Sequence, residues 1–234
     1  RLSGTNGTLT NETRCLTCEA VTSREEHFLD VQVDIEQNSS VTHCLNKFTR
    51  VERLSGTNKF SCECCGSLQE AEKRTRFKSL PKILVMHLKR FKYLENPGIH
   101  AKLSHRVTFP VELRVPATIG SATGPHAGSP PPTIQRSSGE SLPDISTEDD
   151  DPVYYLSAMV AHLGPSAHSG HYVAFIRSGD KWLSMDDTRV QTVEDTEILM
   201  NRAFGVWNHN PEEPQNSASA YILFYERKQE LGKP

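Results

Sequence analysis

Two pairs of cysteines limit most strongly the folds that this chain can adopt. Cys15 and Cys18 form the first pair, and Cys62 and Cys65 form the second, each with two residues between its members. Cys64 is the alternative to Cys65, although only Cys65 repeats the spacing of the first pair. Four thiolates from two such pairs can bind one Zn²⁺ ion at a closed structural site, the alternative being free or disulfide-bonded thiols. Forty-three residues separate the pairs, so the intervening chain must leave the site and return to it.

The chain between the two pairs has the patterns of a strand and a helix. Residues 28–35 alternate apolar and polar side chains, which predicts a half-buried strand. Ser39 and Ser40 can cap a helix. The apolar residues that follow have helical spacing: Val41, Cys44, Leu45 and Phe48. We therefore expect Cys44 in the core and not at a metal.

Residues 162–187 are predicted to contain a β-hairpin. Residues 172–176 are β-branched and aromatic, residues 178–180 are typical of a turn, and residues 182–185 form the return strand. A histidine precedes the first arm and two carboxylates follow the second.

The register of this hairpin decides whether the histidine and a carboxylate meet. With an even loop, His171 and Asp186 lie on one face, directly opposite or one diagonal apart, and a slip of one residue would substitute Asp187. A carboxylate on one imidazole nitrogen fixes the tautomer and leaves the other nitrogen as a base. Gly170 leaves room for a substrate backbone. The alternative is a surface hairpin with an incidental histidine and aspartate.

Three other histidines compete for the role of base. His162 at a strand end and His168 in the following loop have no carboxylate in a defined register. His87 lies within an apolar run and is expected to be a core histidine.

Other segments have recognisable patterns. Residues 83–88 are nearly all apolar, which predicts a central strand buried on both faces. Residues 105–115 predict a strand that Pro110 restricts to an edge or a bulge. Residues 193–204 favour a helix, and residues 220–225 favour a final strand.

Residues 116–152 are rich in Pro, Gly and Ser and end in an acidic run. They contain little apolar material to bury, so we expect a disordered insertion within one domain.

The composition excludes several classes of protein. A net charge of −3 argues against a nucleic-acid partner, and no apolar run approaches the length of a membrane span. The metal-like cysteine spacing favours a reducing compartment, the cytosol or the nucleus. The chain begins with Arg1 and not Met, so we expect a fragment or a processed product.

Several motifs together resemble the ubiquitin-specific proteases, which are papain-like cysteine deubiquitinases. They are the cysteine pairs, LPKILVMHLKRFKY from residue 80, the box from His162 to Asp187 with Ser169-Gly170-His171-Tyr172, and AYILFY from residue 220. The resemblance implies an α+β fold with an antiparallel "palm" sheet and zinc-ribbon "fingers". It implies fingers over residues 8–80, a palm over 81–115 and 153–228, and an insert between them.

The same resemblance implies roles for individual residues. His171 would be the general base, Asp186 would orient it, and Asp187 would support it. The residues that would bind the structural zinc ion are Cys15, Cys18, Cys62 and Cys65.

The resemblance also implies that part of the enzyme is missing. The family carries its nucleophile in an N-terminal box of the kind G-N-T-C-Y-x-N, which this chain lacks. We therefore expect the N-terminal "thumb" with the nucleophilic cysteine to lie outside this chain, and the chain alone to be inactive.

The expected partners are ubiquitin, ubiquitinated proteins and a WD-repeat activator, because four segments resemble the WD-repeat-activated subgroup. These segments are TNETRCLTCE, HLKRFKYLE, KLSHRVTFPVELR and SAYILFYE. The rival hypothesis is a non-catalytic, zinc-containing module that binds ubiquitin. A zinc-ribbon scaffold or nucleic-acid protein is a third, which the acidic balance disfavours.

Overall fold

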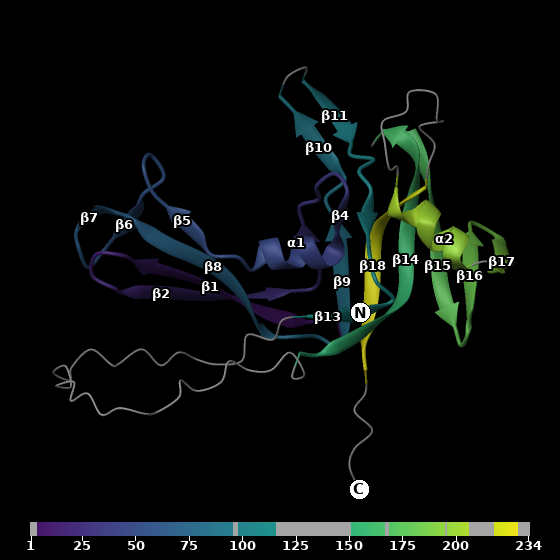
Figure 1. The fold of residues 1–234 in the computed structure, drawn as a ribbon, viewed down its shortest axis with the longest axis horizontal. Helices are drawn as coiled ribbons and strands as arrows, with labels where there is room; N and C mark the ends of the chain where they lie inside the picture. Colours follow the sequence, from purple (N-terminus) through teal and green to yellow (C-terminus); the bar gives the residue numbers. More distant parts are fainter. Residues whose placement is uncertain are drawn as a thin grey trace, which may run out of the picture.

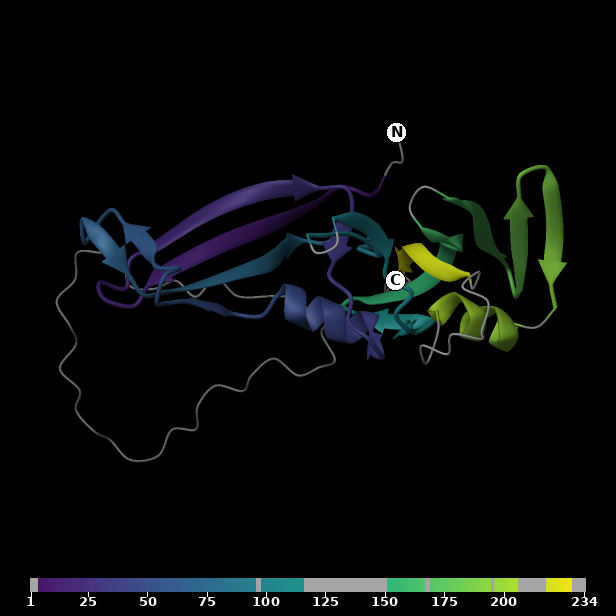
Figure 2. The ribbon, with the colours of Figure 1, turned by 90° about the horizontal axis from the view of Figure 1, so that it is seen from above.

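The computed structural model describes residues 4–95, 98–115, 151–166, 169–194, 196–205 and 218–228. Two β-sheets follow one another along the long axis of the molecule (Figure 1, Figure 2). A four-stranded sheet with a small terminal hairpin forms one end, and an eight-stranded sheet forms the centre and the other end.

The eight-stranded sheet is almost entirely antiparallel, and only β3 and β9 run parallel. The long strand β14 near its middle pairs with β15, β18 and β13. In spatial order the strands are β17 (Arg189–Val193), β16 (Lys181–Asp186), β15 (Ser169–Ser178), β14 (Val153–Ser166), β18 (Ser219–Arg227), β9 (Ile83–Leu88) and β3 (Val31–Val33), with β13 (Glu112–Arg114) beside β14.

The prediction that residues 83–88 are buried on both faces is wrong. Every second residue of β9 is fully buried: Leu84, Met86 and Leu88. Val85 and His87 are half-buried and line an apolar hollow of about 690 Å³ together with Phe224. β14 and β18, nearer the middle of the sheet, alternate in a similar way, so within the described residues the core covers only one face of the sheet.

The four-stranded sheet brings the two cysteine pairs together. Its strands, in spatial order, are β2 (Val21–Phe28), β1 (Gly7–Cys15), β8 (Ala71–Ser79) and β5 (Glu52–Leu54), and β6 (Phe60–Cys62) and β7 (Ser67–Gln69) form the hairpin at its end. β1 and β8 pair along almost their whole lengths, and Cys15 lies opposite Ala71. The second pair, which precedes β8, therefore returns to the first.

Two helices accompany the sheets. The first, α1 (Val41–Phe48), begins at Ser40, whose hydroxyl accepts a hydrogen bond from the backbone N–H of His43. Such a cap stabilises a helix by about 1 kcal/mol. Cys44 lies on the buried face of α1, in the core as predicted. The second helix, α2 (Thr196–Phe204), begins three residues later than expected, because β17 extends to Val193 and pairs with β16.

Two short pairings and a strand break complete the architecture. β10 (Phe91–Leu94) and β11 (Ile99–Lys102) form a hairpin, and β4 (Ser39–Ser40) runs parallel to β12 (Val107–Thr108). Pro110 lies between β12 and β13, as predicted for a residue that interrupts pairing. The single strand expected over residues 28–35 is wrong, because the chain bends at residues 29–30 between β2 and β3.

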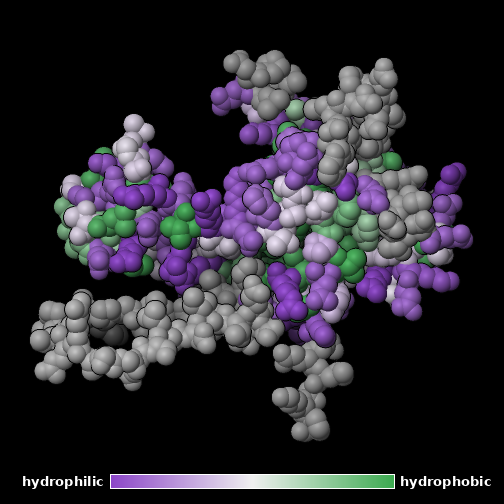
Figure 3. Space-filling view, in the orientation of Figure 1, coloured by the Kyte–Doolittle hydropathy of each residue, from purple (hydrophilic) through white to green (hydrophobic). Residues whose placement is uncertain are grey.

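The core lies within the eight-stranded sheet and its helices. In the space-filling view, apolar side chains gather over the middle of this sheet, whereas the lobe formed by the four-stranded sheet is mostly polar (Figure 3). None of the described helices is long and apolar enough to cross a membrane. The insertion expected over residues 116–152 falls outside the described residues, apart from its last two.

The core position of β18 predicts a large cost for cavity formation there. Leu223 is 0% exposed, so Leu223→Ala should lower the free energy of unfolding by about 2–5 kcal/mol. Leu68→Ala removes the same atoms from a side chain that is 63% exposed, and should cost less than about 0.5 kcal/mol. Chemical denaturation measures both, and equal losses would contradict the assignment of the core.

Candidate functional site

The β15–β16 hairpin brings His171 and Asp186 together. Ala174 pairs with Met185, so Asp186 lies on the same face as His171 and one diagonal away. The odd sum of paired residue numbers follows from the two-residue turn at Gly179, as the sequence predicted. Asp187 is left beyond the last pair of β16.

The imidazole of His171 is bonded to a carboxylate through one nitrogen. Its Nε2 lies 2.5 Å from Oδ1 of Asp186. When this bond carries the proton on Nε2, Nδ1 remains free to accept a proton from a reacting group. The two side chains are 46% and 48% exposed, so such a group can reach the ring. The hydrogen bond to Asp186 raises the pKa of His171 above its usual value.

Asp187 adds a second negative charge near the imidazole. It begins the tight turn between β16 and β17 and has a φ of 50°, a left-handed conformation that aspartate tolerates better than most residues. Its carboxylate lies within 4.8 Å of the ligand atoms of His171 and Asp186. Its charge further raises the pKa of His171.

Two glycines allow the paired strands β14 and β15 to approach each other closely before His171. A Cβ at Gly164 would lie 2.6 Å from the carbonyl oxygen of Ser169 and 2.7 Å from the Cα of Gly170. A Cβ at Gly170 would lie 2.2 Å from Nε2 of His162. Only glycine fits at either position without movement of the neighbouring atoms.

The other histidines are placed differently. His162 is 2% exposed, packs edge-on against Phe91 and Tyr172, and has its pKa lowered by burial and by the charge of Lys102. His87 is half-buried, and burial lowers its pKa. Neither has a carboxylate partner among the hydrogen bonds of the described residues, and His168 lies outside those residues.

The four cysteines chosen from the spacing form one cluster at the other end of the molecule (Figure 1). The Sγ atoms of Cys15 and Cys65 lie 4.0 Å apart, and those of Cys18 and Cys62 lie 3.6 Å apart. A tetrahedral ion with Zn–S bonds of about 2.3 Å requires sulfur atoms about 3.8 Å apart, and a disulfide would require about 2 Å. These thiols could therefore hold a metal ion.

Cys64 is exposed and does not belong to this cluster. The backbone N–H of Cys18 lowers the pKa of the Cys15 thiol to about 6, whereas hydrogen bonding to Cys18 raises the pKa of the Cys65 thiol. Without an ion, the cluster thus favours the thiolate form at Cys15 and the thiol form at Cys65.

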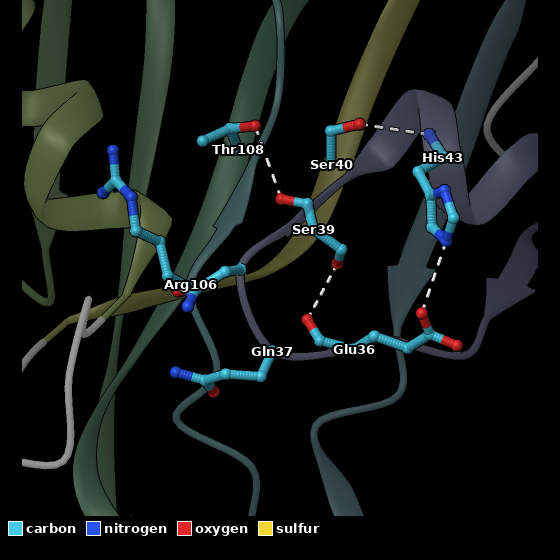
Figure 4. Close-up of a pocket in the computed structure, with 8 residues that line it drawn as sticks. Glu36, Gln37, Ser39, Ser40, His43, Arg106 and Thr108 are labelled. Atoms are coloured by element: carbon cyan, nitrogen blue, oxygen red, sulfur yellow. Dashed lines mark hydrogen bonds and ion pairs between the residues drawn. The ribbon is translucent and has the colours of Figure 1, made fainter.

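A third polar region surrounds the N-terminus of α1 (Figure 4). It is a hollow of about 420 Å³ between β4, α1 and the segment that contains Arg106. Its carboxylate, Glu36, forms ion pairs with Lys47 and His43, and the first of these lowers its pKa. This region does contain a histidine–carboxylate pair, but Nε2 of His43 lies 3.3 Å from Glu36, against 2.5 Å between His171 and Asp186, and the Glu36 carboxylate is already paired with Lys47.

The sequence did not reveal two buried cations at the base of the β10–β11 hairpin. Arg90 is 0% exposed and Lys102 is 9% exposed. Lys102 ends β11, a segment that no motif in the sequence marked as part of the site. Alternation of polar and apolar residues places a lysine on one face of a strand but does not reveal what covers that face.

The comparisons with known proteins agree on one family. The family model "Ubiquitin carboxyl-terminal hydrolase" matches residues 5–225. "Ubiquitin carboxyl-terminal hydrolase 12" from Salmo salar is 44% identical over 222 residues, covering 95% of this chain and 52% of that protein. "Ubiquitin carboxyl-terminal hydrolase 4" from Arabidopsis thaliana is 43% identical over 220 residues, covering 94% of this chain and 52% of that protein.

Solved structures of deubiquitinase modules have the same architecture. The SAGA Ubp8/Sgf11/Sus1/Sgf73 DUB module bound to ubiquitin aldehyde superposes with a TM-score of 0.68 at 26% identity, covering 97% of this chain and 42% of that one. The same module bound to monoubiquitin gives 0.68 at 27% identity, covering 97% and 41%.

The chain therefore has the largely antiparallel architecture of the solved deubiquitinase modules. The chain belongs to the ubiquitin carboxyl-terminal hydrolase family. It spans about half the length of the curated relatives that it matches.

The bond between His171 and Asp186 predicts a measurable change in the titration of the ring. Asp186→Asn removes the charge that raises the pKa of His171, so this pKa should fall toward the usual histidine value. NMR titration of the imidazole measures it. His43→Ala on α1 serves as a control that should leave the His171 titration unchanged, and an unaltered pKa in Asp186→Asn would contradict the observed bond.

Proposed function

We propose that this chain is the base-bearing part of a cysteine-type deubiquitinase that hydrolyses isopeptide and C-terminal bonds of ubiquitin. The observation that carries the proposal is the hydrogen bond between His171 and Asp186, in a chain whose family has this activity as its name. The side chain of His171 is 46% exposed, and only its Nε2 is bonded to the carboxylate, which leaves Nδ1 for a reacting group.

In the first half of the proposed reaction, which leaves ubiquitin as a thioester on the nucleophile, His171 acts twice. It first accepts the proton of the attacking thiol, and it later donates that proton to the leaving lysine amine. In the second half it deprotonates the water that hydrolyses the thioester and returns that proton to the thiolate. Asp186 keeps the ring in one orientation and stabilises the imidazolium, and Asp187 adds to that stabilisation. The space beside Gly170 that was expected to admit a substrate backbone is filled by the ring of His162, so selection of the glycine tail of ubiquitin is proposed from the family resemblance alone.

We further propose that the nucleophile lies outside this chain, in an N-terminal thumb. All six cysteines are among the described residues, and five of them lie at or beside the cluster at the far end of the four-stranded sheet. Cys44 lies on the buried face of α1. None belongs to the group of side chains around His171. On this proposal the chain alone is inactive.

The cysteine cluster is proposed to hold a structural Zn²⁺ at the tip of ubiquitin-binding fingers. The ligands would be Cys15, Cys18, Cys62 and Cys65, whose sulfur spacing fits the ion. Four protein ligands leave no open position for substrate, so the ion would stabilise the fold and supply no chemistry. We assign residues 8–80 to these fingers and residues 81–115 with 153–228 to the palm.

Ubiquitin is the proposed partner, since related modules have been solved with ubiquitin bound. A WD-repeat activator is proposed from the four segments that resemble the activator-dependent subgroup. The free cysteines support a reducing compartment, the cytosol or the nucleus.

The function is tested in the full-length protein with a fluorogenic substrate attached to the C-terminus of ubiquitin. His171→Ala should lower kcat/KM by roughly 10²–10⁴-fold, which is the usual contribution of a general base. His43→Ala, on the exposed face of α1, should stay within about twofold of the wild type. Wild-type turnover that survives in His171→Ala would refute the role of the base, and absence of wild-type turnover with retained ubiquitin binding would favour the binding module.

The metal assignment is tested by zinc content. We expect one zinc per chain in the purified protein, and a loss of zinc in Cys65→Ser because three ligands hold the ion less tightly. Cys64→Ser is the matched control one residue away and should retain the metal. Elemental analysis with thermal unfolding measures both, and zinc loss in Cys64→Ser but not in Cys65→Ser would reverse the assignment.

A further inference from the structure

Two cations are buried side by side where β10, β11 and β14 meet. The Arg90 guanidinium donates to the carbonyl oxygens of Ala220, Leu103 and His105 at 2.5, 3.0 and 2.8 Å. The Lys102 ammonium donates to the carbonyl oxygens of His162 and Gly164 at 2.9 and 2.8 Å. All five acceptors are neutral, and no ion pair among the described residues involves either cation.

Burying a lysine ammonium without a carboxylate partner lowers the stability of the fold. The groups that bind this ammonium therefore indicate why a lysine is present. Burial and the neighbouring charge of Arg90 lower the pKa of Lys102 to about 8. A hydrophobic side chain of similar length would fill the same space without this penalty. What such a side chain cannot do is bind two backbone carbonyl groups on either side of one residue.

The two carbonyl groups lie where β14 changes its course. Both flank Leu163, the residue that pairs with His171 across the β14–β15 ladder. The regular register is lost directly after Leu163, and Gly164 adopts a φ of 129°. Lys102 therefore binds β14 on both sides of Leu163, where its regular pairing with β15 ends, next to His171.

The ring of His162 links this part of β14 to β15. It packs edge-on between Phe91 and Tyr172, with ring centroids 5.2 and 4.8 Å away. Gly170 lies so close to this ring that an added Cβ would meet Nε2 at 2.2 Å. The backbone directly before His171 thus packs against the ring of His162. The backbone carbonyl oxygen of the same residue accepts a hydrogen bond from Lys102.

We propose that Lys102 is a positioning residue for His171. Its ammonium joins the β10–β11 hairpin to the end of β14, and the His162 ring passes this constraint to Gly170 and so to the base. This inference rests on the proposed function of His171. It adds that the hairpin and the base move as one unit, so that contact of a substrate or partner with the hairpin changes the reactivity of His171.

The test uses the full-length protein and two variants of Lys102. Lys102→Met keeps an apolar stem but has no donor, and Lys102→Gln keeps two N–H donors without the charge. We expect kcat to fall roughly tenfold or more in Lys102→Met and less in Lys102→Gln, with KM for the ubiquitin substrate within about twofold, because a small misplacement of a catalytic group lowers the chemical step. Lys89→Met removes an exposed lysine nearby and should change neither constant.

An NMR titration of His171 provides a readout that does not depend on turnover. A loosened His171–Asp186 bond should lower the pKa of His171 in Lys102→Met, whether or not the protein hydrolyses ubiquitin. Unchanged kcat and His171 pKa in a folded Lys102→Met protein would overturn the proposal. If Lys102→Met does not fold, Lys102→Leu, which also lacks a donor, replaces it, and equal kcat and His171 pKa in this variant and the wild type would overturn the proposal. Failure of the proposed function is distinct, because it appears as wild-type turnover that does not require His171.

Discussion

The contact between His171 and Asp186 depends on the register of one pair of strands. A slip of one residue would move these side chains to opposite faces of the sheet. Burial prevents that slip, because Val173 and Trp182 lie on the same face of the hairpin and are 6% and 4% exposed. The apolar side chains that fix the strands in the core thereby fix the imidazole beside its carboxylate.

The two ends of the molecule are held by different physical means. The eight-stranded sheet has a large apolar core, whereas seven of the eight residues of β2 in the four-stranded sheet are exposed. A thin sheet with so little buried surface gains stability from a cross-link at its tip. The four thiols lie at that tip, where the proposed ion would join the returning β6–β7 hairpin to the end of β1. The separation of cluster and hairpin is consistent with a structural ion that takes no part in the chemistry (Figure 1).

The sequence predicted the features that depend on short-range rules. The hairpin parity placed His171 beside Asp186, the repeated spacing selected Cys65 over Cys64 for the cluster, and serine chemistry located the start of α1. Long-range packing decided the remainder. The core covers only one face of β9 because of how the helices and distant strands pack on the sheet, which no local pattern encodes. The burial of Lys102 depends on the return of β14, about sixty residues later in the chain.

The account is tested most directly by a double-mutant cycle of His171 and Asp186 in the full-length protein. Because Asp186 acts only through the ring, Asp186→Asn should lower kcat/KM by roughly tenfold or more when His171 is present. The same substitution in the His171→Ala background should change kcat/KM by less than about twofold. Losses that simply multiply in the double variant would show that the two residues act independently, and would contradict a base held by its neighbouring carboxylate.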